Sequence, residues 1–355
     1  MSWINFLADS FERPARWRRG WVLAALLGTA GLSGLPGCQF ADRSAGRSED
    51  ATDTPTSGHV PVAIDETFAP VLASQVDTFQ KLYTDAHLAV RYQPEDSLFL
   101  ALLNDRVKVI VASRLLGADE KKELDKQAML PITTKVAIDG LAIILHPSNP
   151  DSLLTLAQLR DIFSGQTARW AQVSGHKQLG AINVVFDANR SSTSRAVRDS
   201  LLRGGALSPR AFAATSNPKL IDYVATHPAA VGVVGVNWIS DFDDPAVRGF
   251  LRRVRVAAIT ARPNPKPDDF IKPVQVNLAF KTPKLLREHP DLQNYPLRRD
   301  IYAISREARS GLGSGFVQFV AGQKGQLIFE KSGLMPANAQ ARIVVTSKRP
   351  GAAAK

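Results

Sequence analysis

Three predicted helix starts that carry hydroxyl groups are the parts of this sequence best suited to chemistry. They are Thr67 after the run Val60–Ile64, Ser97 after Leu88–Tyr92, and Ser191-Ser192-Thr193 after Ile182–Phe186. The exits of parallel strands lie along one edge of a sheet, where ligands usually bind. The first turn of a helix offers unpaired N–H groups and a positive dipole end, so hydroxyls there can complete a cage around a small anion. The alternative for each hydroxyl is an ordinary helix N-cap, a position that prefers Ser and Thr.

From Val60 onward, short β-branched runs alternate with longer segments of helical period, which predicts an α/β fold with a largely parallel sheet. We expect strands at Val60–Ile64, Leu88–Tyr92, Val107–Ala112, Thr134–Leu145, Ile182–Phe186, Val231–Val236 and Ile301–Ser305. We expect helices at Ala69–Tyr83, Ser97–Leu103, Leu156–Phe163, Ser194–Leu202, Lys219–Thr226 and Gly315–Phe329. The strands at Thr134–Leu145 and Ile301–Ser305 would cross between two lobes, and two crossovers permit hinge closure around a ligand.

The N-terminal residues have the layout of a secretory signal. Arginines from Arg13 to Arg19 precede the apolar run Trp21–Leu32, and small residues follow as far as Cys38. The stretch Leu35-Pro36-Gly37-Cys38 looks like the lipobox of bacterial lipoproteins, so we expect a lipid on Cys38. The alternative is a plain signal peptide with an incidental cysteine. The polar stretch Gln39–Gly58 that follows is expected to be a flexible tether.

Composition and charge exclude several classes of protein. The hydrophobic share of 45% and the charged share of 22% are those of a folded globule. The net charge is +11, and removal of residues 1–37 leaves +9, because four Arg and two acids are lost (11 − 2). This excess fits an anionic partner. The Lys and Arg are scattered rather than interleaved with aromatic residues, which argues against a nucleic-acid surface.

Enzyme signatures do not match the chain. Ser314 has Leu312 and Phe316 where a nucleophile elbow needs glycines. None of the six His residues falls in a His-Glu-x-x-His arrangement, and a lone Cys cannot form a thiolate zinc site. No Gly-Lys pair is present for a phosphate-binding loop. We therefore expect neither an enzyme nor a metal or other cofactor, with a secreted hydrolase as the weaker alternative.

Taken together, several segments resemble the phosphate-binding proteins of ABC importers, a family of type II periplasmic binding proteins. The resemblance runs from Val60 to Ala337. Its motifs are Glu66–Pro70, Val136–Gly140 continuing to Pro150, Leu154–Trp170, Arg190–Arg195, Ala230–Trp238, Tyr295–Leu297 and Gly315–Pro336. It implies a two-lobed α/β fold hinged by two crossover strands, which closes on phosphate.

The resemblance also implies a set of ligand-binding residues: Thr67, Phe68, Ser97, Arg114, Asp187, Arg190, Ser191, Ser192 and Thr193. Ser192 stands where the family usually has Gly. The family's site arginine and site aspartate correspond here to Asp187 and Arg114. The resemblance therefore implies that an ion pair across the cleft is kept with its ends exchanged. A buried carboxylate can accept the proton of bound hydrogen phosphate while repelling sulfate. Asp139 is expected to be a structural carboxylate at the hinge.

These inferences divide the chain into a signal peptide (1–37), a lipidated tether (38–58), lobe one (59–138 and 298–345), lobe two (139–297) and a disordered tail (346–355). We expect a monomer outside the cytoplasmic membrane, in the periplasm or at the cell surface, held by its lipid anchor. Its expected partners are phosphate or a related oxyanion and the membrane subunits of an ABC importer. An oxyanion sensor or scaffold that does not feed a transporter remains open.

Overall fold

The computed structural model of the chain describes residues 53–175, 177–290, 292–307 and 310–337. The expected signal peptide, the lipid on Cys38 and the tail at 346–355 lie outside these residues. Within them, no helix combines the length and apolar character needed to cross a membrane. Residues 53–57, expected to be part of the tether, are packed. Thr54 and Ser57 form a hydrogen-bonded turn, and Asp53 accepts a hydrogen bond from the backbone N–H of Leu312.

Lobe one contains both ends of the described chain. Its elements are β1 (Gly58–Asp65), the 3₁₀ helix η2 (Glu66–Phe68), α1 (Ala69–Leu82), β2 (Ala86–Gln93), α2 (Glu95–Leu103), β3 (Val109–Ala112), α3 (Ala118–Lys126), β11 (Arg298–Ser305), α11 (Leu312–Ala321), α12 (Gln323–Lys331) and β12 (Met335–Pro336).

Lobe two holds the middle of the chain, and β4 (Ile132–Leu145) leads into it. Its elements are β5 (Leu153–Thr155), α4 (Leu156–Ser164), α5 (Ala171–Ser174), η3 (Lys177–Leu179), β6 (Asn183–Phe186), α6 (Ser192–Ser200), β7 (Ala211–Ala213), α7 (Asn217–Thr226), β8 (Ala230–Gly235), η4 (Val236–Trp238), α8 (Pro245–Arg253), β9 (Arg255–Val256), β10 (Ala258–Thr260), η5 (Pro267–Asp269), α9 (Gln275–Leu278) and α10 (Pro283–Glu288).

One long sheet of the described residues joins the two lobes in the order β2-β1-β3-β11-β4-β8-β6-β7. The outer strands are parallel, because β1 pairs with β2 and β3 and because β6 pairs with β7 and β8 in that sense. The central strand β4 is antiparallel to β11 in lobe one and to β8 in lobe two. The chain returns beside β4 through Leu297, whose carbonyl accepts a hydrogen bond from Leu141 N–H. The first crossover is the strand that the sequence predicts, and the second lies at Leu297, just before the predicted return strand Ile301–Ser305.

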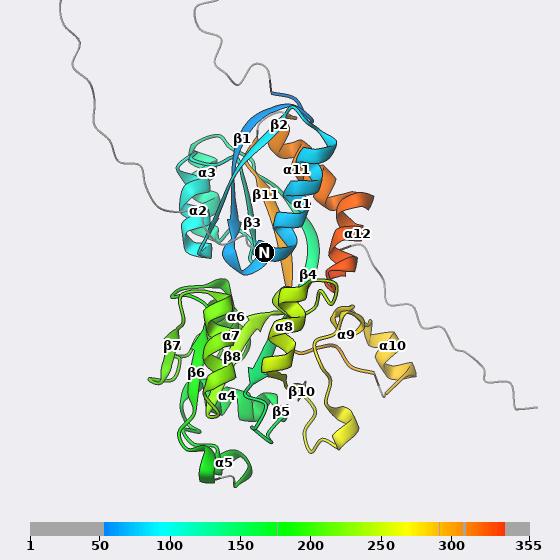
Figure 1. The fold of residues 1–355 in the computed structure, drawn as a ribbon. Helices are drawn as coiled ribbons and strands as arrows, with labels where there is room; N and C mark the ends of the chain where they lie inside the picture. The colour runs from blue at the N-terminus through cyan, green and yellow to red at the C-terminus, as the bar shows by residue number, and fades with distance from the viewer. Residues whose placement is uncertain (1–52, 176, 291, 308–309, 338–355) are drawn as a thin grey trace, which may run out of the picture. The chain divides into compact units, whose positions relative to one another are not determined.

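The inner strands β1 and β3 of lobe one are buried on both faces because helices cover both. Val62 and Ile64 of β1 belong to the core shared with α1, α11 and α12. Ala63, between them, belongs to a second core that includes Leu98 of α2 and Leu124 of α3. The alternation of side chains along a strand produces these two cores. Figure 1 shows α2 and α3 on one face of the β1–β3 sheet and α1 and α11 on the other.

Most predicted elements are present, with two differences that matter. The helix expected over Gly315–Phe329 is two helices, α11 and α12, which meet at Gly322. Gly322 has an extended backbone (ψ 173°), which no residue inside a helix can have. The second helix of lobe one begins at Glu95 rather than Ser97, because Pro94 supplies an extended N-cap and fits poorly inside a helix.

Candidate functional site

Thr67 lies at the centre of a buried polar cluster where the two lobes meet. Its hydroxyl donates to Asp187 Oδ2 of lobe two at 3.2 Å and lies 3.2 Å from the Ser192 hydroxyl, with either oxygen able to donate. Its backbone carbonyl accepts hydrogen bonds from Asn237 Nδ2 at 3.0 Å and Trp238 Nε1 at 2.8 Å. Thr67 is therefore fixed by contacts from two segments that are distant in sequence, 187–192 and 237–238.

Asp187 is the acceptor on which the donors of lobe two converge. It follows β6 directly and precedes α6, and its side chain is fully buried. Besides the Thr67 hydroxyl, Oδ2 accepts from Thr193 Oγ1 and Asn217 Nδ2, both at 3.4 Å. Its other oxygen, Oδ1, has no hydrogen-bond partner among the described residues. The start of α6 adds free N–H groups and a positive dipole end, which favour negative charge at this point.

Arg299 supplies a positive charge to the cluster and is not among the site residues predicted from the sequence. Its guanidinium donates twice to Asp139 Oδ2, at 2.9 and 3.0 Å, and once to the Ser192 hydroxyl at 3.1 Å. It also lies over the ring of Phe68, 4.7 Å from the ring centre. Burial nevertheless raises the pKa of Asp139, against the opposing effect of Arg299. Asp139 is thus the structural carboxylate expected near the hinge.

The predicted ion pair between Arg114 and Asp187 is not formed. Arg114 instead donates two hydrogen bonds of 2.7 Å to Glu120 and lies 3.4 Å above the ring centre of Phe99. The pair that joins the lobes is made by Arg195 of α6 and Glu95 of α2, whose Nε and Oε2 atoms are 2.5 Å apart. Arg195 also donates to the hydroxyl of Ser113. A cross-cleft ion pair therefore exists, but other residues form it.

The remaining predicted residues separate into two groups. Thr67, Phe68, Asp187, Ser192 and Thr193 are fully buried in or beside the cluster. Ser191 is buried too, but its hydroxyl caps α6 by accepting a hydrogen bond from Ser194 N–H, as the N-cap alternative has it. Ser97 and Arg190 are exposed. Their side chains do not join the hydrogen bonds of the cluster.

Asp65 adds a further buried carboxyl at the end of β1. Its Oδ1 accepts from Thr67 N–H at 3.0 Å, and burial followed by the nearby Glu95 raises the pKa of Asp65 to about 7. The unfolded pKa of an aspartate is about 4. Between these values the native protein binds the extra proton, so stability falls as pH rises from about 4 to 7.

We expect Asp65→Asn to remove this pH dependence while keeping the cap on Thr67. Above about pH 7 the variant should be the more stable protein, because the wild type then buries an ionised carboxylate. The unfolding free energy of the variant minus that of the wild type should grow by at most about 1.4 kcal/mol per unit of rising pH between pH 4 and 7. Urea unfolding of both proteins across this range measures it. A difference that does not change with pH would contradict the assignment.

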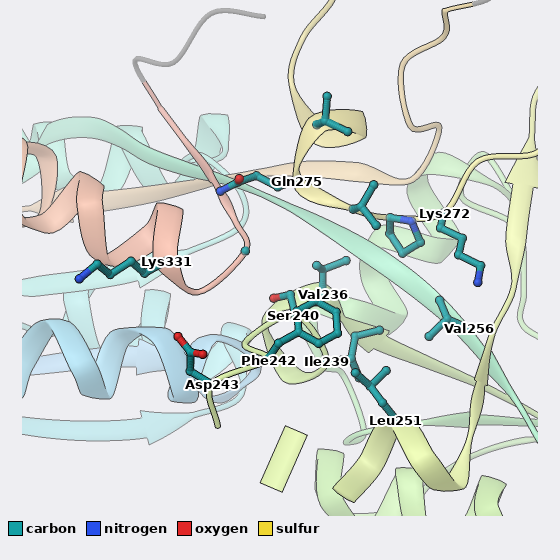
Figure 2. A pocket seen from close by; sticks show the side chains of 14 residues that line it. Val236, Ile239, Ser240, Phe242, Asp243, Leu251, Val256, Lys272, Gln275 and Lys331 are labelled. Carbon is teal, nitrogen blue, oxygen red and sulfur yellow. The ribbon is translucent and has the colours of Figure 1, made fainter. Parts of the chain in front are cut away.

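A cavity lies apart from the cluster and shares none of its residues. This cavity of about 730 Å³ lies between η4, α8, α9 and the end of α12. Figure 2 shows Ile239, Phe242 and Leu251 among its walls, with Lys272 and Lys331 on opposite sides. Its walls are mainly apolar, whereas a small oxyanion needs converging donors. The cluster around Thr67 is therefore the better candidate site for such a ligand. No three His, Cys, Asp or Glu residues within the described part of the chain are grouped to hold a metal.

The two α/β lobes, their shared sheet and the buried cluster between them define a type II periplasmic binding protein. Residues 49–324 match the PBP superfamily domain. The chain therefore belongs to the PBP superfamily.

Relatives and solved structures agree with this family. The chain is 24% identical over 119 residues to the phosphate-binding protein PstS 2 of Streptococcus agalactiae. The aligned segment covers 34% of this chain and 39% of the relative. The chain is 28% identical over 120 residues to the phosphate-binding protein PstS of Staphylococcus epidermidis, with 34% and 37% covered. The matched parts thus span well under half of these relatives.

The fold is similar to that of an ABC-type phosphate transport receptor from Vibrio cholerae, with a TM-score of 0.58 and 19% identity over 79% of this chain and 100% of the receptor. It is also similar to PfluDING, a high affinity periplasmic phosphate-binding protein solved with phosphate, with a TM-score of 0.60 and 16% identity over 78% and 90% of the two chains. At these identities the similarity establishes the fold.

Proposed function

We propose that this protein is an extracytoplasmic solute-binding lipoprotein that captures phosphate between its lobes and delivers it to an ABC importer. The observation that carries the proposal is the convergence of hydroxyl and amide donors from both lobes: Thr67, Ser192, Thr193 and Asn217. Arg299 adds a buried positive charge to the same network. The names of the relatives support phosphate as the oxyanion, and the expected lipobox at Cys38 supports the anchor.

Binding requires the lobes to part around this cluster. Thr67, in lobe one, is in direct hydrogen-bond contact with Asp187 and Ser192 of lobe two. The side chains that would bind phosphate therefore bind one another in this structure. The crossovers at β4 and Leu297 are the places where a hinge can act. Several hydrogen bonds to a charged acceptor, each worth about 1.5–3 kcal/mol, are sufficient for micromolar or tighter binding after ordering costs.

A second function, an oxyanion sensor or scaffold without a transporter, is favoured by one feature. The donors of the cluster already have an acceptor within the protein, Asp187. Such a site has a defined ligand-free state, so exchange of Asp187 for an oxyanion could act as a signal without transport. Phosphate uptake by cells that lack this chain separates the two functions, because only the transport function predicts slower uptake.

We expect Thr67→Val to weaken phosphate binding by about 10- to 100-fold, because valine keeps the shape but removes one donor to a charged acceptor. Calorimetric titration with phosphate, arsenate, molybdate and sulfate measures this loss and ranks the oxyanions. Thr84→Val, at an exposed turn, is the matched control and should bind as the wild type does. Ser97→Ala tests the predicted hydroxyl that is exposed, and this exposure predicts a change in phosphate affinity of less than about twofold. Equal affinities of Thr67→Val and wild type would reject the site.

A further inference from the structure

Asp187 stands in the place that an oxyanion ligand should occupy. Three donors, from Thr67, Thr193 and Asn217, meet at its Oδ2 atom. The side chain is fully buried, and Oδ1 lacks a hydrogen-bond partner among the described residues. The carboxylate precedes α6 in the chain and accepts a hydrogen bond from the hydroxyl of Thr193, in the first turn of that nine-residue helix. It therefore uses side-chain donors that the proposed function assigns to phosphate.

The charges around Asp187 leave it uncompensated. The two arginines at the contact between the lobes are already paired, Arg299 with Asp139 and Arg195 with Glu95. Arg190, three residues after Asp187, is exposed. Asp65 from the end of β1 and Glu66 from η2 add two further carboxyl groups. Burial and, after it, Asp187 raise the pKa of Glu66, while burial and Glu95 raise the pKa of Asp65 to about 7. A phosphate that enters with full charge meets a surplus of negative charge.

We propose that Asp187 is an internal anion that holds the donors of the ligand-free site, and that phosphate replaces it with the uptake of one proton from solvent. The proton ends on the Asp187 carboxyl or on a phosphate oxygen that donates back to it, and no other bond is made or broken. This inference rests on the proposed function. It makes the affinity of the wild type fall as pH rises, because the second anion can enter only with a proton.

Asp187→Asn tests the inference, because it keeps the shape and removes the charge. The variant should bind phosphate at least about tenfold more tightly than the wild type near pH 8. This difference should shrink by up to about tenfold for each pH unit that the pH is lowered, because binding to the wild type takes up one more proton than binding to the variant. Titrations in buffers of different ionisation enthalpy should show about one proton fewer taken up by the variant. Free phosphate has the same protonation equilibrium in both titrations, so its contribution to proton uptake cancels when the two proteins are compared. Asp85→Asn, on an exposed turn, is the matched control and should follow the wild type.

The outcomes separate this inference from the proposed function. If both proteins bind phosphate with equal affinity and equal proton uptake, the inference is wrong and the function stands. If only Asp187→Asn binds, Asp187 is an internal anion that phosphate does not replace, so the replacement step and phosphate capture by the wild type are both rejected.

Should neither protein bind phosphate, the proposed function fails, and the ligand-free protein decides the inference. Asp187→Ala leaves a hole lined by donors, which formate can fill. A rise in the melting temperature of Asp187→Ala with formate, absent from the wild type, supports an internal anion. No rise overturns it.

Discussion

Replacement of Arg299 by methionine should lower the free energy of unfolding by about 3–5 kcal/mol, the range found when one partner of a buried ion pair is removed. The loss is large because Asp139 is fully buried, and its charge would have no counter-charge in contact. The same change removes the donor to the Ser192 hydroxyl and the contact with the Phe68 ring. Urea unfolding measures the effect.

Arg298→Met is the matched control for this prediction. Arg298 is the preceding residue of β11 but is only partly buried, and its guanidinium lies 4.7 Å from the ring centre of Phe280. Its loss should cost about 1 kcal/mol or less. Adding Asp139→Leu to Arg299→Met should recover most of the larger loss, because the buried charge disappears. If Arg299→Met were no more destabilising than Arg298→Met, the buried pair would not organise the cluster.

Local signals in the sequence were enough to find the lobe-facing hydroxyls. Thr67 and the Ser191–Thr193 run were identified because a helix start has a recognisable residue preference and fixed chemistry. The helix predicted at Leu156–Phe163 from its helical period is α4, which also has local start and stop signals: a capping box of Thr155 and Gln158, and Gly165 after its last residue in the left-handed conformation (φ 85°). Features that depend on a few neighbouring residues can be predicted from one sequence.

The charge pairs of the site could not be found in this way. Arg299 and Asp139 are 160 residues apart, and Arg195 and Glu95 are 100 apart. Which arginine meets which carboxylate depends on strand register and on how the lobes pack, and neither is encoded in spacing. The resemblance therefore supplied Arg114 and Asp187 as partners, whereas Glu120, six residues along the chain, holds Arg114.

Ser97 was misplaced by an error of two residues. The helix starts at Glu95, so the side chain that reaches the cleft is that carboxylate rather than the hydroxyl. One turn of a helix rotates side chains through a full circle, so a small shift in its start changes which residue faces the site. Helix boundaries are the least predictable part of such an element.

Arg195→Met should lower the free energy of unfolding by about 2–3 kcal/mol and loosen the contact between the lobes. Glu95 is 1% exposed and would lose its counter-charge, although the 21% exposure of Arg195 keeps the cost below that of a fully buried pair. Arg195 also holds the Ser113 hydroxyl, so one side chain connects α6 to both α2 and the end of β3. Hydrogen exchange should therefore speed up at the starts of α2 and α6.

The second ion pair of Arg195 provides the control. Asp199, on the outer side of α6, accepts from the same guanidinium at 3.0 Å but is 56% exposed. Asp199→Ala should cost less than about 0.5 kcal/mol and leave exchange at α2 unchanged, because solvent already screens that pair. Converting Glu95 to leucine together with Arg195→Met should recover stability without restoring slow exchange, since apolar packing replaces the charge but not its bonds to Ser113. If the Arg195–Glu95 pair did not join the lobes, Arg195→Met and Asp199→Ala would have the same small effect on the unfolding free energy and on hydrogen exchange.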